Sequence, residues 1–268
     1  MNVVSCLTLC WYTSTVGIHQ EMDGGTNPIS SYPFPPNDLY KGSTTKMKIL
    51  AIHGSPRTIR STTRKLAGFV LEGAADAGAE IEMIDLADHR IIPCSACEAC
   101  SLNGICVNDD DVPPLMARMQ AADAIVFGSP VYIDNISGQM KVFFDRLADA
   151  IHYQQLAGKF GCAVATTEES GGDDVVVYLS HVLNYLGVVS VGGISVAIGG
   201  KAESVDAEEP AARALGKKLV DAVRDGYPDP VQEAVLADNR AYFRSLVLEN
   251  RDLRTDEYER WVKMGWIR

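Results

Sequence analysis

The sequence has no excess of positive charge and no long apolar run. Its 268 residues carry 24 Lys and Arg against 35 Asp and Glu, a formal net charge of -11. A nucleic-acid partner needs a basic surface that neutralises phosphates, so we expect no such partner. No apolar stretch approaches the roughly 20 residues that cross a bilayer, so we also expect no membrane-spanning helix.

An export signal is lacking too, and cysteine is scarce. The apolar residues 1–12 have neither a basic start nor a small-residue cleavage site, which predicts a cytoplasmic protein. Four of the seven cysteines lie within residues 94–106. In a cytoplasmic chain such a cluster indicates metal or redox chemistry rather than a disulfide framework. Cys6, Cys10 and Cys162 lie apart from it, and we expect Cys162 to be a small buried apolar residue.

The chain divides into three parts by composition. Residues 23–45 are rich in Gly, Asn, Pro, Ser and Thr without periodicity, and we interpret residues 1–46 as a poorly ordered extension. They are either a functional tail or a segment upstream of a true start at Met47. Residues 47–226 alternate between strand and helix patterns, and residues 227–268 form a helical tail. Because a short amphipathic tail cannot bury its own apolar face, it docks on the core or on a second subunit.

Five short apolar segments are predicted to be strands, with amphipathic helices between them. The segments are Lys48–His53, Ile81–Leu86, Ala124–Gly128, Cys162–Thr166 and Val188–Ile198. Strands that alternate with helices form a parallel sheet covered on both faces. Right-handed crossovers then favour an α/β fold with a flavodoxin-like, doubly wound, five-stranded parallel sheet.

A loop rich in hydroxyl side chains follows the first strand. Residues 54–63 have the sequence Gly-Ser-Pro-Arg-Thr-Ile-Arg-Ser-Thr-Thr and open a helix, whose unpaired N–H groups attract phosphate. The candidate phosphate-binding residues are Ser55, Arg57, Ser61, Thr62 and Thr63. The loop lacks both the Walker ending and the dinucleotide fingerprint, and a hydroxyl-rich helix cap is the structural alternative. Asp85 ends the second strand, where it is either a ribose-reading acid or an ordinary strand-end residue.

Two further loops follow the third and fourth predicted strands. Ligands of open α/β sheets lie outside the carboxyl ends of the strands, so these loops face the same crevice as the first. The second loop contains Pro130, Val131, Tyr132 and Ser137, the last of which is also a candidate helix cap. The third loop contains Thr167 and Gly171 on either side of two adjacent glutamates.

The cysteine cluster has the spacing C-x2-C-x2-C-x5-C. Its members are Cys94, Cys97, Cys100 and Cys106. Structural zinc sites pair two C-x2-C motifs across a dozen or more residues, whereas a single compact run is closer to iron–sulfur binding sequences. Small neighbours allow the backbone to fold closely and donate N–H groups to sulfur. An iron–sulfur cluster, zinc and no metal all stay open at this point.

These motifs together resemble one family. The loop at 54–63, the Pro-Val-Tyr sequence, the Ser-Gly-Gln-Met-Lys and Phe-Phe-Asp-Arg sequences at 137–146, and the cysteine run with its flanking Ile-Pro and triple Asp resemble the iron–sulfur flavoproteins of the NADPH-dependent FMN reductase superfamily. The resemblance covers about residues 47–226. It departs at Thr62, where many members have Asn, and at the two glutamates 168–169.

The resemblance implies both cofactors and their positions. The first loop is implied to bind the phosphate of FMN, residues 130–132 to line the isoalloxazine ring with Ser137 nearby, and the four cysteines to bind a [4Fe–4S] cluster. The implied function is an electron-transfer oxidoreductase with a ferredoxin or NAD(P)H as donor, a small-molecule acceptor and a homo-oligomeric assembly. We expect no catalytic side chain, because the cofactors carry the chemistry.

Other interpretations fit the same residues. A cluster-free NAD(P)H-dependent FMN or quinone reductase would differ in its metal content and hydride donor. A zinc-stapled interaction module without flavin would be colourless. His53, at the end of the first predicted strand, either tunes the flavin or is a structural histidine.

Overall fold

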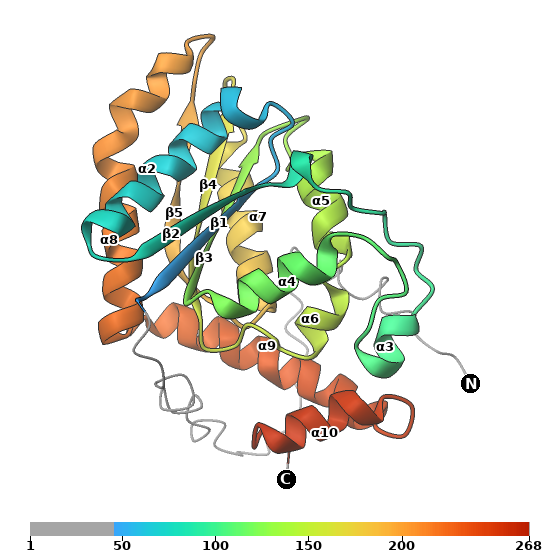
Figure 1. Ribbon diagram of the computed structural model, residues 1–268. Coiled ribbons are helices and arrows are strands. Elements are labelled where there is room, and N and C mark those ends of the chain that lie inside the picture. Colours follow the sequence, from blue (N-terminus) through green and yellow to red (C-terminus); the bar gives the residue numbers. More distant parts are fainter. Residues whose placement is uncertain (1–45, 268) are drawn as a thin grey trace, which may run out of the picture.

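A computed structural model describes residues 46–267 and contains one parallel sheet (Figure 1). The strands in this part of the chain run in the order β2-β1-β3-β4-β5. Their bounds are Lys48–His53 for β1, Glu80–Asp85 for β2, Ala124–Pro130 for β3, Phe160–Thr167 for β4 and Val189–Ala197 for β5. The predicted fold is therefore confirmed, and each strand boundary lies within two residues of the prediction. Cys6, Cys10 and all but the last residue of the predicted extension lie outside the described residues.

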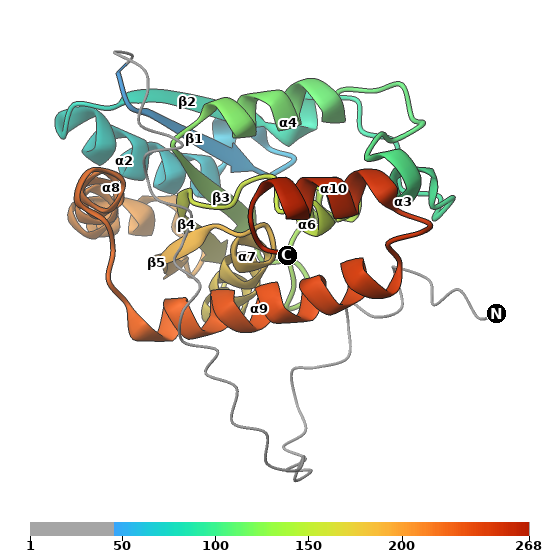
Figure 2. The same ribbon diagram turned by 90° about the horizontal axis from the view of Figure 1, so that it is seen from below.

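Helices cover both faces of the sheet (Figure 2). The α2 and α8 helices, Thr62–Asp76 and Glu209–Asp225, pack on one face, where Leu66, Val70 and Leu219 are buried. On the other face lie α4, α5, α6 and α7, with the bounds Val112–Ala121, Gly138–Asp145, Ala148–His152 and Gly172–Tyr185.

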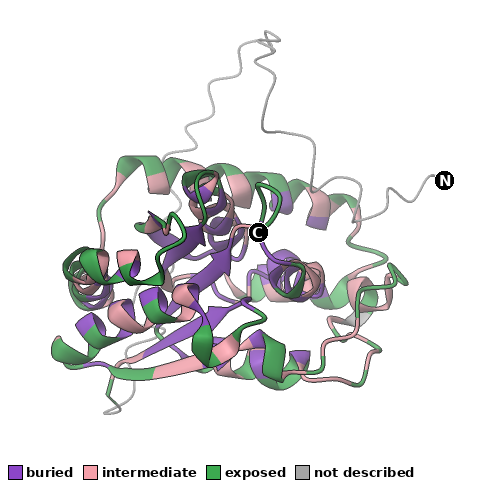
Figure 3. Ribbon diagram, turned by 90° about the horizontal axis from the view of Figure 1, so that it is seen from above, coloured by how far each residue is buried: buried purple, intermediate pink, exposed green. Residues whose placement is uncertain are grey.

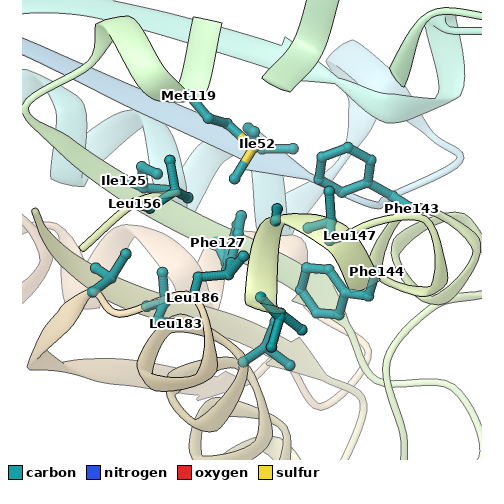
Figure 4. Packing of buried hydrophobic residues seen from close by; sticks show 14 of the residues in the cluster. Ile52, Met119, Ile125, Phe127, Phe143, Phe144, Leu147, Leu156, Leu183 and Leu186 are labelled. Atoms are coloured by element: carbon teal, nitrogen blue, oxygen red, sulfur yellow. The ribbon is translucent and has the colours of Figure 1, made fainter. Parts of the chain in front are cut away.

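The second face holds the aromatic core (Figure 4). Phe127 of β3 packs against Phe144 of α5, with ring centroids 5.1 Å apart. Successive residues of β1 alternate between the two cores, Leu50 on this face and Ala51 on the other. Because both faces are covered, the central strands β1 and β3 are buried along almost their whole length (Figure 3).

Short helical elements occupy the connections. They are the 3-10 helices η3, η4 and η5, at Thr58–Arg60, Leu86–Asp88 and Ala202–Glu208, and the α-helix α3, at Ala99–Asn103. The α3 helix lies inside the cysteine loop and α6 follows α5; the sequence analysis predicted neither. Each has five residues, which is too short for helical periodicity to be detected.

The C-terminal tail docks on the core of its own chain. It consists of α9, Pro230–Glu249, and α10, Thr255–Lys263. The Asp229 carboxylate caps α9 by accepting the backbone N–H groups of the next turn. Phe243 and Trp261 are fully buried in the aromatic core, and Trp261 Nε1 donates to the carbonyl of His152 at 2.9 Å. The α10 helix lies beside α3, so the tail also contacts the cysteine loop (Figures 1 and 2). No helix within residues 46–267 is long and apolar enough to cross a bilayer.

Candidate cofactor site

The predicted phosphate loop is organised by the start of α2. Ser61 is the N-cap, and its hydroxyl accepts the Arg64 backbone N–H at 3.1 Å. The Thr63 hydroxyl lies 2.5 Å from the hydroxyl of Thr166, and the Thr62 hydroxyl donates to the same oxygen at 3.3 Å. The structure thus gathers three predicted hydroxyl residues around a helix N-terminus, and it adds Thr166 of β4, which the sequence analysis had not selected.

The rest of the loop supplies one buried hydroxyl and one exposed cation. Ser55 is buried, and its Oγ accepts the backbone N–H of Arg57 at 3.3 Å. The Arg57 side chain is exposed at the rim of the loop. A helix N-terminus with hydroxyl groups and one exposed guanidinium at its edge has the chemistry of a phosphate site. The residues present therefore fit the phosphate group of FMN.

The second loop is held against the first by α5. The Ser137 hydroxyl donates to the Gly54 carbonyl at 2.6 Å and accepts the Met140 N–H at 3.2 Å, so Ser137 is the N-cap of α5. A Cβ on Gly54 would lie 2.6 Å from Ser137 Oγ and 2.7 Å from Met140 Cβ. Gly54 is thus required for the close approach of α5 to the first loop. Because Ser137 is fully buried and bonded to protein groups, its contribution to flavin binding stays a prediction.

The second loop folds back on itself at its tip. Tyr132 N donates to Asn135 O at 2.8 Å, and Asn135 N returns the bond to Tyr132 O at 3.1 Å. The two residues between them, Ile133 and Asp134, have φ of 51° and 54°, a region that a β-branched residue seldom adopts. The turn leaves Tyr132 and Ile133 exposed beside the loop entrance. An exposed apolar turn of this kind suits contact with a flat aromatic ring.

The third loop meets the second. Gly171 has φ of 79° as the N-cap of α7, and a Cβ there would lie 3.1 Å from Asp134 Oδ1. The Thr167 hydroxyl donates to the Ser170 carbonyl within the loop. Val131 N donates to the Thr166 carbonyl at 2.8 Å, which ties the second loop to β4. The three predicted loops therefore converge at the carboxyl edge of the sheet.

A buried histidine is hydrogen-bonded to the backbone of the first loop. His53 contacts Asp85 through Nε2, and its Nδ1 accepts the Ser55 backbone N–H at 3.3 Å. Arg64 Nε donates to both Asp85 oxygens, at 3.0 and 3.1 Å. Burial lowers the pKa of His53 more than Asp85 raises it, which keeps the ring neutral near pH 7. His53 is thus bonded to the first loop and to Asp85, and Asp85 is also engaged by Arg64.

The cysteine loop is half-buried or exposed at every residue from 91 to 109 whose burial the structure describes. Cys94 and Cys97 are exposed, Cys100 and Cys106 are half-buried, and no cysteine of the described residues forms a disulfide. Within residues 46–267, no three Cys, His, Asp or Glu side chains lie close enough together to hold a metal ion. Four thiols on one short loop have the donor chemistry of a cluster or zinc site, but their sulfurs do not converge in this conformation.

Local backbone groups favour a reactive sulfur in this loop. Hydrogen bonds from the backbone N–H of Ala99 and from the Ser95 side chain lower the pKa of Cys97, and the thiolate is the form that binds metals. Ala96 and Glu98 have φ of 54° and 59°, so the backbone turns sharply between the first three cysteines. Cys162, by contrast, is fully buried in β4, as predicted, and burial raises its pKa to about 12.

A buried ion pair anchors both ends of the cysteine loop. Arg146, the residue that ends α5, contacts Asp110 and donates from Nη1 to the Ile92 carbonyl at 2.6 Å. Asp110 accepts the backbone N–H of Ile92 at 2.8 Å and that of Val112 at 3.1 Å. Burial raises the pKa of Asp110, but Arg146 and these two N–H groups together lower it by more, so the net shift of the pKa is downward.

The sequence analysis missed this anchor. The Phe-Phe-Asp-Arg sequence had been used only as a motif of the family resemblance, although its arginine contacts the cysteine loop, where Nη2 lies 3.2 Å from Cys106 Sγ. At the start of α4, the Val112 N–H donates to the carboxylate of Asp110 rather than to that of Asp111. Asp111 occupies the N-cap position without a side-chain bond to the helix, and its carboxylate instead accepts the Arg90 N–H at 2.7 Å.

Comparison with known proteins connects these sites. The sequence profile described as NADPH-dependent FMN reductase matches residues 47–203. An iron–sulfur flavoprotein of Archaeoglobus fulgidus is 30% identical over 226 residues, which cover 82% of this chain and 100% of that protein. An iron–sulfur flavoprotein of Methanocaldococcus jannaschii is 35% identical over 190 residues, which cover 66% of this chain and 98% of that protein.

Solved structures show the same fold at lower identity. An NAD(P)H:quinone oxidoreductase from Methanothermobacter marburgensis superposes with a TM-score of 0.53 at 19% identity and covers 65% of this chain and 96% of its own. The enzyme RosB, with a bound flavin-derived intermediate, gives a TM-score of 0.54 at 17% identity and covers 73% and 87%. At these identities the likeness concerns the fold alone.

Proposed function

Since the chain belongs to the NADPH-dependent FMN reductase family, with iron–sulfur flavoproteins among its relatives, and is a flavin-dependent oxidoreductase, we propose that it passes electrons between a [4Fe–4S] cluster and FMN. The cluster is bound by the cysteine loop and FMN by the crevice at the carboxyl edge of the sheet. A ferredoxin or NAD(P)H supplies the electrons, and a small molecule accepts them.

The observation that carries this proposal is the position of α5. The helix begins at Ser137, which is bonded to the phosphate loop through Gly54, and it is followed by Arg146, which contacts Cys106. With eight residues, α5 is about 12 Å long. One short helix therefore joins the crevice to the cysteine loop, and this arrangement suits two redox centres that exchange electrons.

The residues of the crevice divide into two groups in this proposal. One group cradles the FMN phosphate: Ser55, Arg57, Ser61, Thr62 and Thr63. The other surrounds the isoalloxazine ring: Pro130, Val131, Tyr132, Ser137, Thr167 and Gly171. Bound FMN supplies the conversion between one-electron and two-electron transfer, and the protein orients it and excludes water.

The cluster ligands in this proposal are Cys94, Cys97, Cys100 and Cys106. Their sulfurs lie apart, so we infer that loading of the cluster closes the loop around them. We further propose a cytoplasmic homo-oligomer in which residues 47–226 form the cofactor-binding domain and residues 227–268 the docked tail.

The test is anaerobic purification followed by a visible spectrum and assays for iron, sulfide and flavin. We expect flavin bands on a broad brown absorbance, with about four iron and four sulfide per chain. A yellow protein that stays free of iron and sulfide after anaerobic reconstitution would contradict the cluster and leave a cluster-free NAD(P)H-dependent FMN or quinone reductase. Stoichiometric zinc without flavin would contradict both cofactor assignments.

A further inference from the structure

The Arg146 side chain is buried to an unusual degree for a charged group. Only 1% of the side chain is exposed, and none of its partner Asp110. A buried guanidinium is tolerated when its charge is balanced and its N–H groups are bonded. Here Nη1 bonds to the Ile92 carbonyl and Asp110, and Nη2 bonds to Asp110 at 3.3 Å and to Cys106 Sγ at 3.2 Å.

One buried N–H of this side chain is left over. Arg146 Nε is buried without a hydrogen-bond partner among the described residues. A buried donor without a partner is unfavourable, so such a group normally faces something that completes it. The leftover N–H belongs to the same guanidinium that already donates to a predicted ligand sulfur, at the base of the loop where we place the cluster.

We propose that Arg146 is a positioning residue that fixes the Cys106 sulfur and sets the reduction potential of the centre bound there. The proposal rests on the proposed function, since it requires a cluster on the cysteine loop. Asp110 holds the guanidinium, the guanidinium holds Cys106, and the same two side chains bind the chain before and after the loop, at Ile92 and Val112.

The physical effect has a definite sign. Hydrogen bonds to cluster sulfur and nearby positive charge stabilise the reduced, more negative cluster, so they raise the reduction potential. Burial strengthens this effect because solvent does not screen the charge. A lysine would keep the charge, but its compact ammonium cannot reproduce the fork that reaches a carbonyl, a carboxylate and a sulfur together.

The test compares three anaerobically purified proteins: wild type, Arg146→Lys and Arg90→Gln. Arg90 is the matched control because it also contacts the loop end, through the Asp109 carbonyl at 3.3 Å, but it is exposed and touches no cysteine. Cluster potentials are measured by a redox titration followed by electron paramagnetic resonance. Iron and FMN contents are measured on the same samples.

We expect Arg146→Lys to keep its FMN and to shift the cluster to a more negative potential. The ratio of reduced to oxidised cluster at a fixed potential should fall about tenfold, equivalent to about 59 mV for a one-electron couple. Arg90→Gln should match wild type, because an exposed charge is screened. Equal potentials in all three proteins would overturn the proposal and leave the proposed function intact, whereas wild-type protein without a cluster would overturn both.

A second measurement leaves Arg146 in place and so does not depend on the folding of an Arg146 variant. Protein labelled with ¹⁵N only in arginine is reduced, and the hyperfine coupling of the cluster to ¹⁵N is recorded. A guanidinium bonded to a ligand sulfur should give a resolved ¹⁵N coupling that persists in Arg90→Gln. Its absence in wild type would overturn the proposal, since a purely structural arginine gives no such signal.

Discussion

The crevice and the cysteine loop are both built from loops, yet the fold supports them very differently. In the crevice, Ser55, Ser61, Thr63 and Ser137 are buried and bonded to neighbouring protein groups. In the cysteine loop, every residue from 91 to 109 whose burial the structure describes is half-buried or exposed. The two ends of that loop are held by the buried pair of Arg146 and Asp110, and α3 in its middle packs against α10.

This difference indicates two ways of making a cofactor site. The crevice is preformed, because the same hydrogen bonds that close the sheet edge also orient its hydroxyls. The cysteine loop is half-buried or exposed where its burial is described, and its sulfurs lie apart, so the ligand sulfurs depend on the metal to bring them together. Changes in one region should therefore affect one cofactor and spare the other.

The largest effect expected is loss of the cluster from Cys97→Ser. Removing one of four ligands should reduce iron and sulfide from about four per chain to a small residue, while FMN stays near one per chain. The measurement is iron, sulfide and flavin analysis of anaerobically reconstituted protein. Cys162→Ala is the matched control, because Cys162 lies in β4 outside the loop and its loss should leave iron unchanged. Parallel loss of iron and flavin in Cys97→Ser would contradict the claim that a change in one region spares the cofactor of the other.

Next in size is the destabilisation expected from Gly54→Ala. The added Cβ would overlap Ser137 and Met140, so α5 must shift, at a cost of about 1–3 kcal/mol in the free energy of unfolding and a loss of FMN affinity. Denaturant unfolding and flavin titration measure the two effects. Gly68→Ala in α2 is the control: nothing lies within 4 Å of its added Cβ, and it should be neutral or stabilising by up to about 1 kcal/mol. Equal behaviour of the two alanine variants would refute the close-approach argument.

A smaller effect concerns pH and the buried His53. Because its pKa in the folded protein is lowered from 6.5, the unfolded chain takes up a proton that the folded chain refuses. The free energy of unfolding should therefore fall as pH drops from about 6.5 towards the lowered pKa, by at most about 1.4 kcal/mol per pH unit. Unfolding curves recorded between pH 5 and 8, at steps of about half a pH unit, measure this slope. An identical slope in His53→Gln would show that another group causes it.

The smallest effect expected is at Glu98, whose φ of 59° is unfavourable for any residue except glycine. Glu98→Gly should relieve this strain and slow hydrogen exchange of the α3 amides by up to about fivefold, equivalent to about 1 kcal/mol. Glu98→Ala removes the same charge but keeps the unfavourable φ, so it should not slow exchange. Equal rates in the two variants would mean that the loop backbone is not strained in solution.

The fold and the crevice could be predicted because their signals are local. Buried parallel strands are continuous apolar runs, and the hydroxyl-rich loop directly follows the first of them, so pattern and position together place Ser61 and Thr63 at the sheet edge. The docking of the tail could not be predicted, because an apolar helix face does not specify its partner. Trp261 is buried in the aromatic core of its own chain.

The anchor of the cysteine loop was beyond prediction for a different reason. Arg146 and Asp110 are 36 positions apart. Each lies in a motif that the sequence analysis used only for the family resemblance. Only the packing of α5 against the loop brings the two together. Thr166, which meets the hydroxyls of Thr62 and Thr63 from over 100 positions away, was missed for the same reason.

Electron transfer between the two sites is the central claim, and rapid-freeze electron paramagnetic resonance tests it most directly. Oxidised protein is mixed anaerobically with a one-electron donor, and the cluster signal and flavin absorbance are followed over time. We predict that the reduced-cluster signal appears first and decays as the flavin bleaches, and that Cys97→Ser slows flavin bleaching at least tenfold (~10-fold per 1.4 kcal/mol of barrier). Flavin reduction at the same rate in both proteins would contradict the account.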